Sequence, residues 1–164
     1  MKIMKFGGTS VGNPDRMRSI IPLINGDEKV IVVLSALSGT TNSLVEISDL
    51  LYAGNTGEAS RKNEALRTKY YKVVEDLYSS AEFKKKGHEL INSHFDYINE
   101  FINHTFGKQH EKAIIAQGEL ISTALFHNLL SENQIPSVLL PALSFMRIDK
   151  EGEPDSFYIE ENFK

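Results

Sequence analysis

A lysine followed directly by two glycines near the start of the chain has the chemistry of a phosphate-binding loop. Lys5 and Phe6 close a short apolar segment, and Gly7 and Gly8 come next. The ammonium group supplies positive charge, and backbone without side chains exposes N–H groups that can donate to phosphate oxygens. The order differs from a Walker P-loop, in which the lysine follows the glycines. The alternative is a solvated lysine beside an ordinary glycine turn.

A second candidate is the hydroxyl-rich loop at residues 35–42, which reads Ser-Ala-Leu-Ser-Gly-Thr-Thr-Asn. Hydroxyl and N–H groups at the start of a helix can receive a carboxylate or a phosphate. The alternative is ordinary N-capping by Thr41 or Asn42. Ligands bind at the carboxyl ends of the strands in open α/β sheets, so two such loops on successive strands favour a shared ligand site.

A third candidate is the pair Gly118-Glu119 in an otherwise apolar helical pattern. Glycine inside a helix is unfavourable by about 1 kcal/mol relative to alanine. Gly118 therefore indicates either a close approach of another segment or a break in the helix. Glu119 could bind an ammonium group, or it could be a carboxylate at a helix start, where the helix dipole favours negative charge.

Hydrophobic patterns predict the elements that position the first two loops. Residues 1–6 and 29–34 read as strands, and the β-branched run in the second predicts burial on both faces. Asn13 and Pro14 predict a helix start between them, and a further helix is expected over 43–53. Strand, loop and helix repeated twice form a βαβα unit, which is typical of a doubly wound sheet.

The rest of the chain is expected to be mainly helical. Charges and apolar residues at helical spacing predict two or three long helices within 55–112, as an insertion packed beside the sheet. A further helix is expected over 111–131 and a strand within 135–140. The acidic stretch 147–164 lacks periodicity and is expected to form a β-type or loop segment.

Composition narrows the class of protein. The 164 residues include 41% hydrophobic and 24% charged side chains, which fits one folded domain or a large part of one. The net charge of −4 argues against a nucleic-acid partner, and the lack of cysteine excludes disulfides and zinc–thiolate sites. With no signal-peptide core and no apolar run of about 20 residues, we expect a cytoplasmic protein without a membrane partner. Five histidines lack metal-ligand spacing and are expected on the surface or in packing: His88, His94, His104, His110 and His127.

Three segments of the sequence resemble the aspartokinases of the amino acid kinase family. They are residues 5–12 (Lys-Phe-Gly-Gly-Thr-Ser-Val-Gly), residues 33–42 with the hydroxyl-rich loop, and residues 117–122 with the Gly-Glu pair. The resemblance implies an α/β fold: the N-terminal half of a three-layer sandwich with a mainly parallel sheet. It also implies ATP-dependent phosphorylation of the β-carboxylate of L-aspartate to 4-phospho-L-aspartate. That reaction is the first step towards lysine, threonine and methionine.

The same resemblance implies a role for each candidate residue. Lys5 would neutralise charge on the transferred phosphoryl group, and the backbone of Phe6, Gly7 and Gly8 would bind the ATP phosphates. Ser35 and Thr41 would hold L-aspartate, and Glu119 would bind its ammonium group. ATP and Mg²⁺ are the implied cofactors, with most of the Mg²⁺ site expected outside these 164 residues.

The family's catalytic domain is much longer, so residues 1–164 are expected to be one partial domain. The C-terminal half and the regulatory ACT domains would be absent, and the chain alone would be inactive. The parent could be monofunctional or fused to homoserine dehydrogenase, and an exposed sheet edge would favour a homo-oligomer. The alternatives are another amino acid kinase with a carboxylate or carbamate substrate, and a truncated, non-catalytic module that binds aspartate or an anion.

Overall fold

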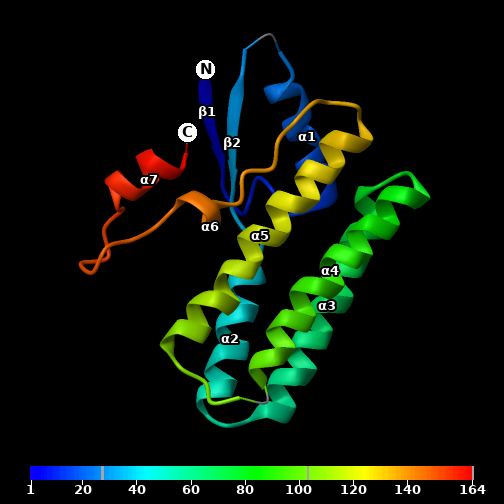
Figure 1. Cartoon of the computed structure of the whole chain (residues 1–164). Helices are drawn as coiled ribbons and strands as arrows, with labels where there is room; N and C mark the ends of the chain where they lie inside the picture. Colours follow the sequence, from blue (N-terminus) through cyan, green and yellow to red (C-terminus); the bar gives the residue numbers. More distant parts are fainter. Residues whose placement is uncertain (27, 103, 164) are drawn as a thin grey trace.

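Two parallel strands carry the first two loops (Figure 1). The computed structural model describes residues 1–26, 28–102 and 104–163. Strand β1 (Lys2–Phe6) pairs with β2 (Val30–Leu34), and Lys5 lies opposite Val33. The strands are parallel because helix α1 (Pro14–Ile24) returns the chain between them. The predicted cap is confirmed, since the Asn13 side chain accepts a hydrogen bond from the backbone N–H of Arg16 at 2.9 Å.

The two faces of this sheet differ. Val32 packs against the core and Leu34 is buried within it, whereas Val33 is 45% exposed and Ile3 is 69% exposed. The expectation that residues 29–34 are buried on both faces is therefore wrong for the described chain. Successive side chains of a strand point to opposite faces, and here only one face meets the core. The α/β class with a parallel sheet is confirmed.

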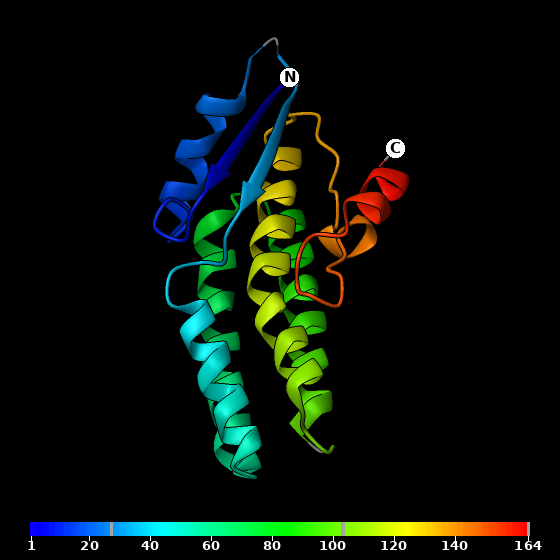
Figure 2. The ribbon, with the colours of Figure 1, turned by 90° about the vertical axis from the view of Figure 1, so that its left-hand side faces the viewer.

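Four long helices form a bundle that extends away from the strands (Figure 2). They are α2 (Thr40–Tyr52), α3 (Thr56–Leu77), α4 (Ala81–Ile102) and α5 (Lys108–Glu132). Helix α3 packs between α2 and α4, and α5 closes the bundle against α4 and α2. The long helices predicted for this region are confirmed. Their predicted place beside the sheet is wrong, because α3 and α4 bury their apolar faces against each other, α2 and α5.

The chain beyond α5 is more open. The left-handed Gln134 (φ 59°) ends the helix, and the N–H of Ile135 donates to Leu130 O at 2.9 Å. The strand predicted within 135–140 is wrong, because this segment pairs with neither β1 nor β2, and a strand needs a neighbour for its N–H and C=O groups.

The final segment is partly helical, contrary to the expected β-type or loop excursion. Short helix α6 (Ala142–Phe145) precedes an isolated antiparallel bridge between Ile148 and Pro154. Helix α7 (Ser156–Asn162) follows and is capped by Asp155, whose carboxylate accepts from the N–H of Tyr158 at 3.0 Å. Apolar periodicity did not reveal this helix, because none of its residues is fully buried.

Candidate active site

The glycine loop after β1 lies against the second loop. Gly7 O accepts hydrogen bonds from the backbone N–H groups of Ser10 (2.8 Å) and Val11 (3.2 Å), which form a tight turn. A Cβ on Gly8 would lie 3.2 Å from Ala36 O, so this position has little room for a side chain. A Cβ on Gly7 would have no neighbour within 4 Å. The loop is therefore packed at Gly8 and open at Gly7.

Lys5 lies beside this loop on the open face of the sheet. Its side chain is exposed and makes no hydrogen bond or ion pair with any residue that the structure describes. The next residue, Phe6, accepts a hydrogen bond through its carbonyl from the N–H of Ser35 at 3.0 Å. The two loops thus start side by side at the carboxyl edge of the sheet. The residue before Phe6 is Lys5, whose ammonium group has no partner among the described residues.

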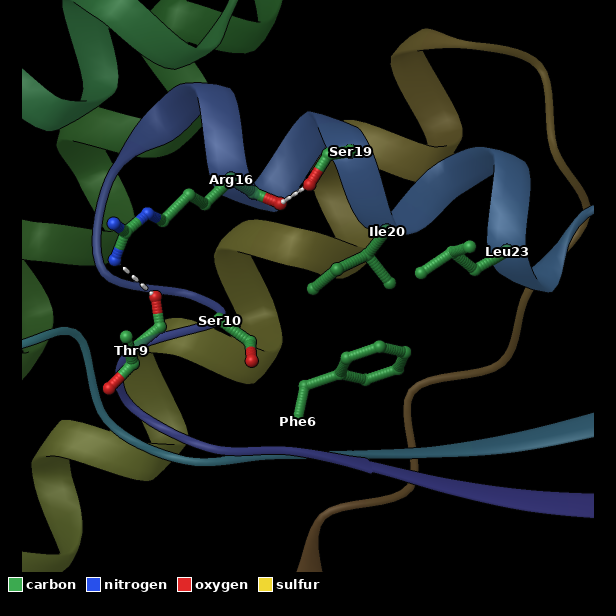
Figure 3. Close-up of a pocket in the computed structure, with 7 residues that line it drawn as sticks. All are labelled: Phe6, Thr9, Ser10, Arg16, Ser19, Ile20 and Leu23. Carbon is green, nitrogen blue, oxygen red and sulfur yellow. Dashed lines mark hydrogen bonds between the residues drawn. The ribbon is translucent and has the colours of Figure 1, made fainter.

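Helix α1 holds the other side of the glycine loop, as Figure 3 shows. Arg16 Nη1 donates to Thr9 O at 2.7 Å, and Ser19 Oγ donates to Arg16 O at 2.7 Å. A shallow pocket of about 360 Å³ lies here, with apolar walls from Phe6 and Ile20. Among the candidate site residues only Phe6 lines this pocket, and Lys5 and Glu119 do not.

The second loop enters α2 without a side-chain cap. Gly39 is the N-cap residue, and its φ of +79° lies in the left-handed region that favours glycine. Helix α2 begins at Thr40, so Thr41 and Asn42 lie within its first turn, and the capping alternative is wrong for both. The side-chain hydroxyls of Ser35 and Thr41 have no hydrogen-bond partner in the described ranges. Both hydroxyls remain available to a ligand.

Helix α5 meets this loop at the Gly-Glu pair. Glu119 Oε1 accepts a hydrogen bond from the N–H of Ala36 at 3.3 Å, and Ser122 Oγ donates to Ser35 O at 2.7 Å. A Cβ on Gly118 would lie 2.8 Å from Ala36 Cβ, so the close approach predicted at this glycine is confirmed. The helix break and the helix-start carboxylate are both wrong, because α5 continues unbroken from Lys108 to Glu132. A carboxylate has about four lone-pair positions, so Glu119 can accept further donors.

Two residues of α3, which the sequence did not reveal as site residues, support the same loop. Lys69 Nζ donates to Ser38 O at 3.2 Å, and the hydroxyl of Tyr70 lies 2.8 Å from Thr40 Oγ1. Burial raises the pKa of Tyr70, and the negative charge of Glu119 raises it further, so the phenol stays protonated. The sequence does not distinguish these two residues from others in an amphipathic helix. Tyr70 belongs to the apolar repeat of the helix, and Lys69 is typical of its solvent-exposed face.

The histidines do not form a metal centre. His94 Nδ1 lies 2.6 Å from Gln117 Oε1, and His88 Nε2 lies 2.7 Å from Glu75 Oε1. Over residues 1–26, 28–102 and 104–163, no three His, Cys, Asp or Glu side chains are grouped to hold a metal ion.

The candidate site and the sequence together place the chain in a protein family. The glycine loop, the hydroxyl-rich loop and the Glu119 carboxylate come together at the carboxyl edge of a parallel sheet, and Lys5 lies on the strand that leads into the glycine loop. The sequence model of the amino acid kinase family matches residues 1–159, and the chain belongs to that family. Within residues 1–26, 28–102 and 104–163, none of the helices combines the length and the apolar composition that a membrane-spanning helix needs.

Relatives of the chain within this family include aspartokinases, which confirms the resemblance. The chain is 30% identical over 157 residues to lysine-sensitive aspartokinase 3 of Escherichia coli (strain K12), covering 93% of this chain and 34% of that protein. It is 32% identical over 143 residues to the aspartokinase of Rickettsia conorii, covering 83% of this chain and 33% of that protein. The chain thus spans about a third of the length of these relatives.

Solved structures agree with the sequence comparison. E. coli aspartokinase III in complex with aspartate and ADP (R-state) matches with a TM-score of 0.80 and 28% identity. The match covers 99% of this chain and 36% of that one. The same enzyme in complex with lysine and aspartate (T-state) matches with a TM-score of 0.79 and 27% identity, covering 98% and 36%. The described fold thus matches about a third of E. coli aspartokinase III.

Proposed function

We propose that this chain is the acceptor-binding part of an aspartate kinase, which phosphorylates the β-carboxylate of L-aspartate with ATP. The observation that carries the proposal is the contact of Glu119 with the Ala36 N–H, in a loop whose Ser35 and Thr41 hydroxyls have no hydrogen-bond partner among the described residues. Support also comes from the aspartokinase relatives at about 30% identity. The reaction would open the route to lysine, threonine and methionine in the cytoplasm.

The proposed acceptor site matches the charges of an amino acid. The Glu119 carboxylate would accept from the substrate ammonium while it keeps its bond to Ala36. The hydroxyls of Ser35 and Thr41 would donate to the substrate carboxylates, helped by N–H groups in the first turn of α2. An acceptor without an ammonium group would leave the Glu119 carboxylate without a cation. The site should therefore bind such an acceptor more weakly than an amino acid.

The proposed phosphoryl transfer needs positioning and charge more than a base. The acceptor carboxylate, with a usual pKa of about 4, is already ionised at neutral pH. One of its oxygens would attack the γ-phosphorus, the bond to the β-phosphate oxygen would break, and the electron pair would leave on ADP. Lys5 would neutralise the charge on the transferred group, and the backbone at Phe6, Gly7 and Gly8 would hold the phosphates.

The nucleotide side requires more than these residues provide. Mg²⁺ bound to ATP would neutralise the phosphate oxygens, and we assign no step to it because no group of three potential ligand side chains occurs among the described residues. The relatives are about three times as long. We therefore propose that the remaining nucleotide and metal ligands correspond to sequence outside these 164 residues, and that this chain has no turnover alone. Self-association into a homo-oligomer is part of the same proposal.

A hybrid enzyme tests the proposal. This chain would replace the matching part of E. coli aspartokinase III, and ADP release would be measured with L-aspartate, L-glutamate and carbamate in turn. We expect turnover with L-aspartate only. Preference for L-glutamate or carbamate would identify a different amino acid kinase. A folded hybrid without turnover, together with aspartate binding by this chain, would favour the non-catalytic module.

A further inference from the structure

Two consecutive residues of α3, Lys69 and Tyr70, hold the acceptor loop (residues 35–42) from two directions. We propose that they are positioning residues, which make the shape of the acceptor site depend on the helical bundle. The inference about the loop stands on geometry alone, and its consequence for substrate affinity rests on the proposed function.

Tyr70 holds the start of α2 through a buried hydrogen bond. Its hydroxyl and Thr40 Oγ1 are 2.8 Å apart, and both side chains are 1% exposed. Neither hydroxyl has another partner among the residues that are described. Loss of one would leave the other buried and unpaired, which is more unfavourable than loss of a solvated hydrogen bond.

Thr40 also contacts the helix that carries Glu119. A Cβ on Gly118 would lie 3.2 Å from Thr40 Cγ2 and 2.8 Å from Ala36 Cβ. Thr40 is therefore held between the Tyr70 hydroxyl of α3 and the backbone of α5. Movement of Thr40 would shift Thr41, the next residue, relative to the Glu119 carboxylate.

Lys69 holds the other side of the turn. Its exposed ammonium group donates to Ser38 O at 3.2 Å, directly before the left-handed Gly39. Ser38 in turn packs against the glycine loop, since its Cβ lies 3.2 Å from a Cβ built on Gly12. The Lys69 bond thus stabilises the turn at the point where the two candidate loops touch.

Gly39 lies between two residues that α3 binds. Lys69 bonds to Ser38, which precedes Gly39, and Tyr70 bonds to Thr40, which follows it. The conformation of this turn is therefore determined by α3 as well as by local sequence. The bonds involve no residue assigned to phosphate binding. Their loss is expected to weaken acceptor binding while the apparent KM for ATP stays nearly constant.

Backbone hydrogen exchange of the 164-residue chain tests the loop inference without any activity. The reporters are the Thr40 N–H, bonded to Leu37 O at 3.0 Å, and the Ser43 N–H, bonded to Gly39 O at 3.2 Å. We expect Tyr70→Phe to speed exchange at both amides about fivefold, the effect of one lost hydrogen bond. The matched control is Tyr71→Phe, which removes a tyrosine hydroxyl bonded to Asn92 instead. Equal exchange in Tyr70→Phe, Tyr71→Phe and the parent chain would overturn the inference.

Two further sets of variants distinguish the loss of the Tyr70–Thr40 and Lys69–Ser38 hydrogen bonds from a general loss of stability. Thr40→Val removes the partner hydroxyl, so the double variant with Tyr70→Phe should exchange no faster than the faster single variant. Additive effects would show that the hydroxyls act independently and would contradict the pairing. Lys69→Met should speed exchange about twofold, whereas Lys72→Met on the same helix should leave it unchanged. Equal effects of the two lysine variants would remove Lys69 from the inference.

Substrate titration then addresses the functional consequence. In the hybrid enzyme, Tyr70→Phe should raise the KM for L-aspartate about fivefold and change the KM for ATP less than twofold. Tyr71→Phe should change neither. Faster loop exchange with an unchanged KM for L-aspartate would contradict the positioning role. A parent chain that binds no L-aspartate would contradict the proposed function, while the exchange data would still decide the loop contacts.

Discussion

Glu119 Oε1 of α5 accepts a hydrogen bond at 3.3 Å from the backbone N–H of Ala36, a residue 83 positions earlier in the chain. Ser122, one turn further along α5, donates to Ser35 O at 2.7 Å. The two bonds join a helix of the bundle to the loop that follows β2. They hold the Glu119 carboxylate against the loop that carries the Ser35 and Thr41 hydroxyls, which have no hydrogen-bond partner among the described residues.

Two substitutions separate the contribution of the Glu119 charge to stability from that of its hydrogen bond to Ala36. Glutamine keeps an oxygen acceptor for the Ala36 N–H, so Glu119→Gln should change the free energy of unfolding by less than about 0.5 kcal/mol. Glu119→Ala removes the acceptor and should destabilise the fold by about 1 kcal/mol. Denaturant unfolding measures both variants. Equal destabilisation by the two variants would show that the bond to Ala36 does not stabilise the loop.

Gly118 is required by the contact between α5 and the acceptor loop. A Cβ there would lie 2.8 Å from Ala36 Cβ, so Gly118→Ala should destabilise the fold by about 1–3 kcal/mol. The matched control is Gly57→Ala in α3, where a Cβ would have no neighbour within 4 Å. That substitution should stabilise the protein by up to about 1 kcal/mol, because alanine favours helix. Thermal unfolding distinguishes them, and a neutral Gly118→Ala would contradict the close approach.

Alkaline pH should destabilise the fold through buried tyrosines. Burial raises the pKa of Tyr78, and the charge of Glu132 raises it further, while the hydroxyl lies 2.8 Å from Leu125 O. Above about pH 10 the unfolded chain loses the tyrosine proton and the folded chain keeps it. The free energy of unfolding should therefore fall with rising pH, by about 1.4 kcal/mol per pH unit for each such tyrosine.

Tyrosine variants test that slope by denaturant unfolding between pH 9 and 11. Tyr78→Phe should make the decline shallower, because one group no longer titrates differently in the two states. Tyr97→Phe is the control, since Tyr97 is 38% exposed. Identical slopes in Tyr78→Phe and the parent chain would show that Tyr78 ionises as easily in the folded state.

Lys5 should act on the reaction step more than on acceptor binding. In the hybrid enzyme, Lys5→Met should lower kcat about 100-fold, the effect of removing one charged group from a transition state. The KM for L-aspartate should change less than threefold. The control is Lys2→Met on the same strand, because Lys2 pairs with Glu28 and lies outside the proposed site. An unchanged kcat in Lys5→Met would exclude Lys5 from the phosphoryl transfer.

The local features of the fold could be predicted because short-range chemistry determines them. Asn13 and Pro14 gave the start of α1, and the β-branched run gave β2. The close approach at Gly118 followed from the unfavourable energy of glycine in a helix. The strand expected within 135–140 failed for a non-local reason, because a strand also needs a partner, and neither described strand pairs with it.

The candidate site could be predicted only where special residue types mark it. Glycines, hydroxyls and an acid in an apolar helix pointed to the loops and to Glu119. Lys69 and Tyr70 carry no such mark, since each suits its place in an ordinary amphipathic helix. Their role depends on how α3 packs against α2, and that packing is a tertiary property. Arg16, which donates to Thr9 O, was missed for the same reason.

The most direct test of the acceptor site is calorimetric titration of the 164-residue chain with L-aspartate and with succinate, which lacks only the amino group. We predict that L-aspartate binds at least about tenfold more tightly than succinate, because a charged hydrogen bond to Glu119 contributes about 1.5–3 kcal/mol. Glu119→Gln should abolish most of that difference, because it weakens the binding of L-aspartate and removes the unpaired charge that disfavours succinate. Equal binding of L-aspartate and succinate by the parent chain would contradict the assignment of Glu119 to the substrate ammonium.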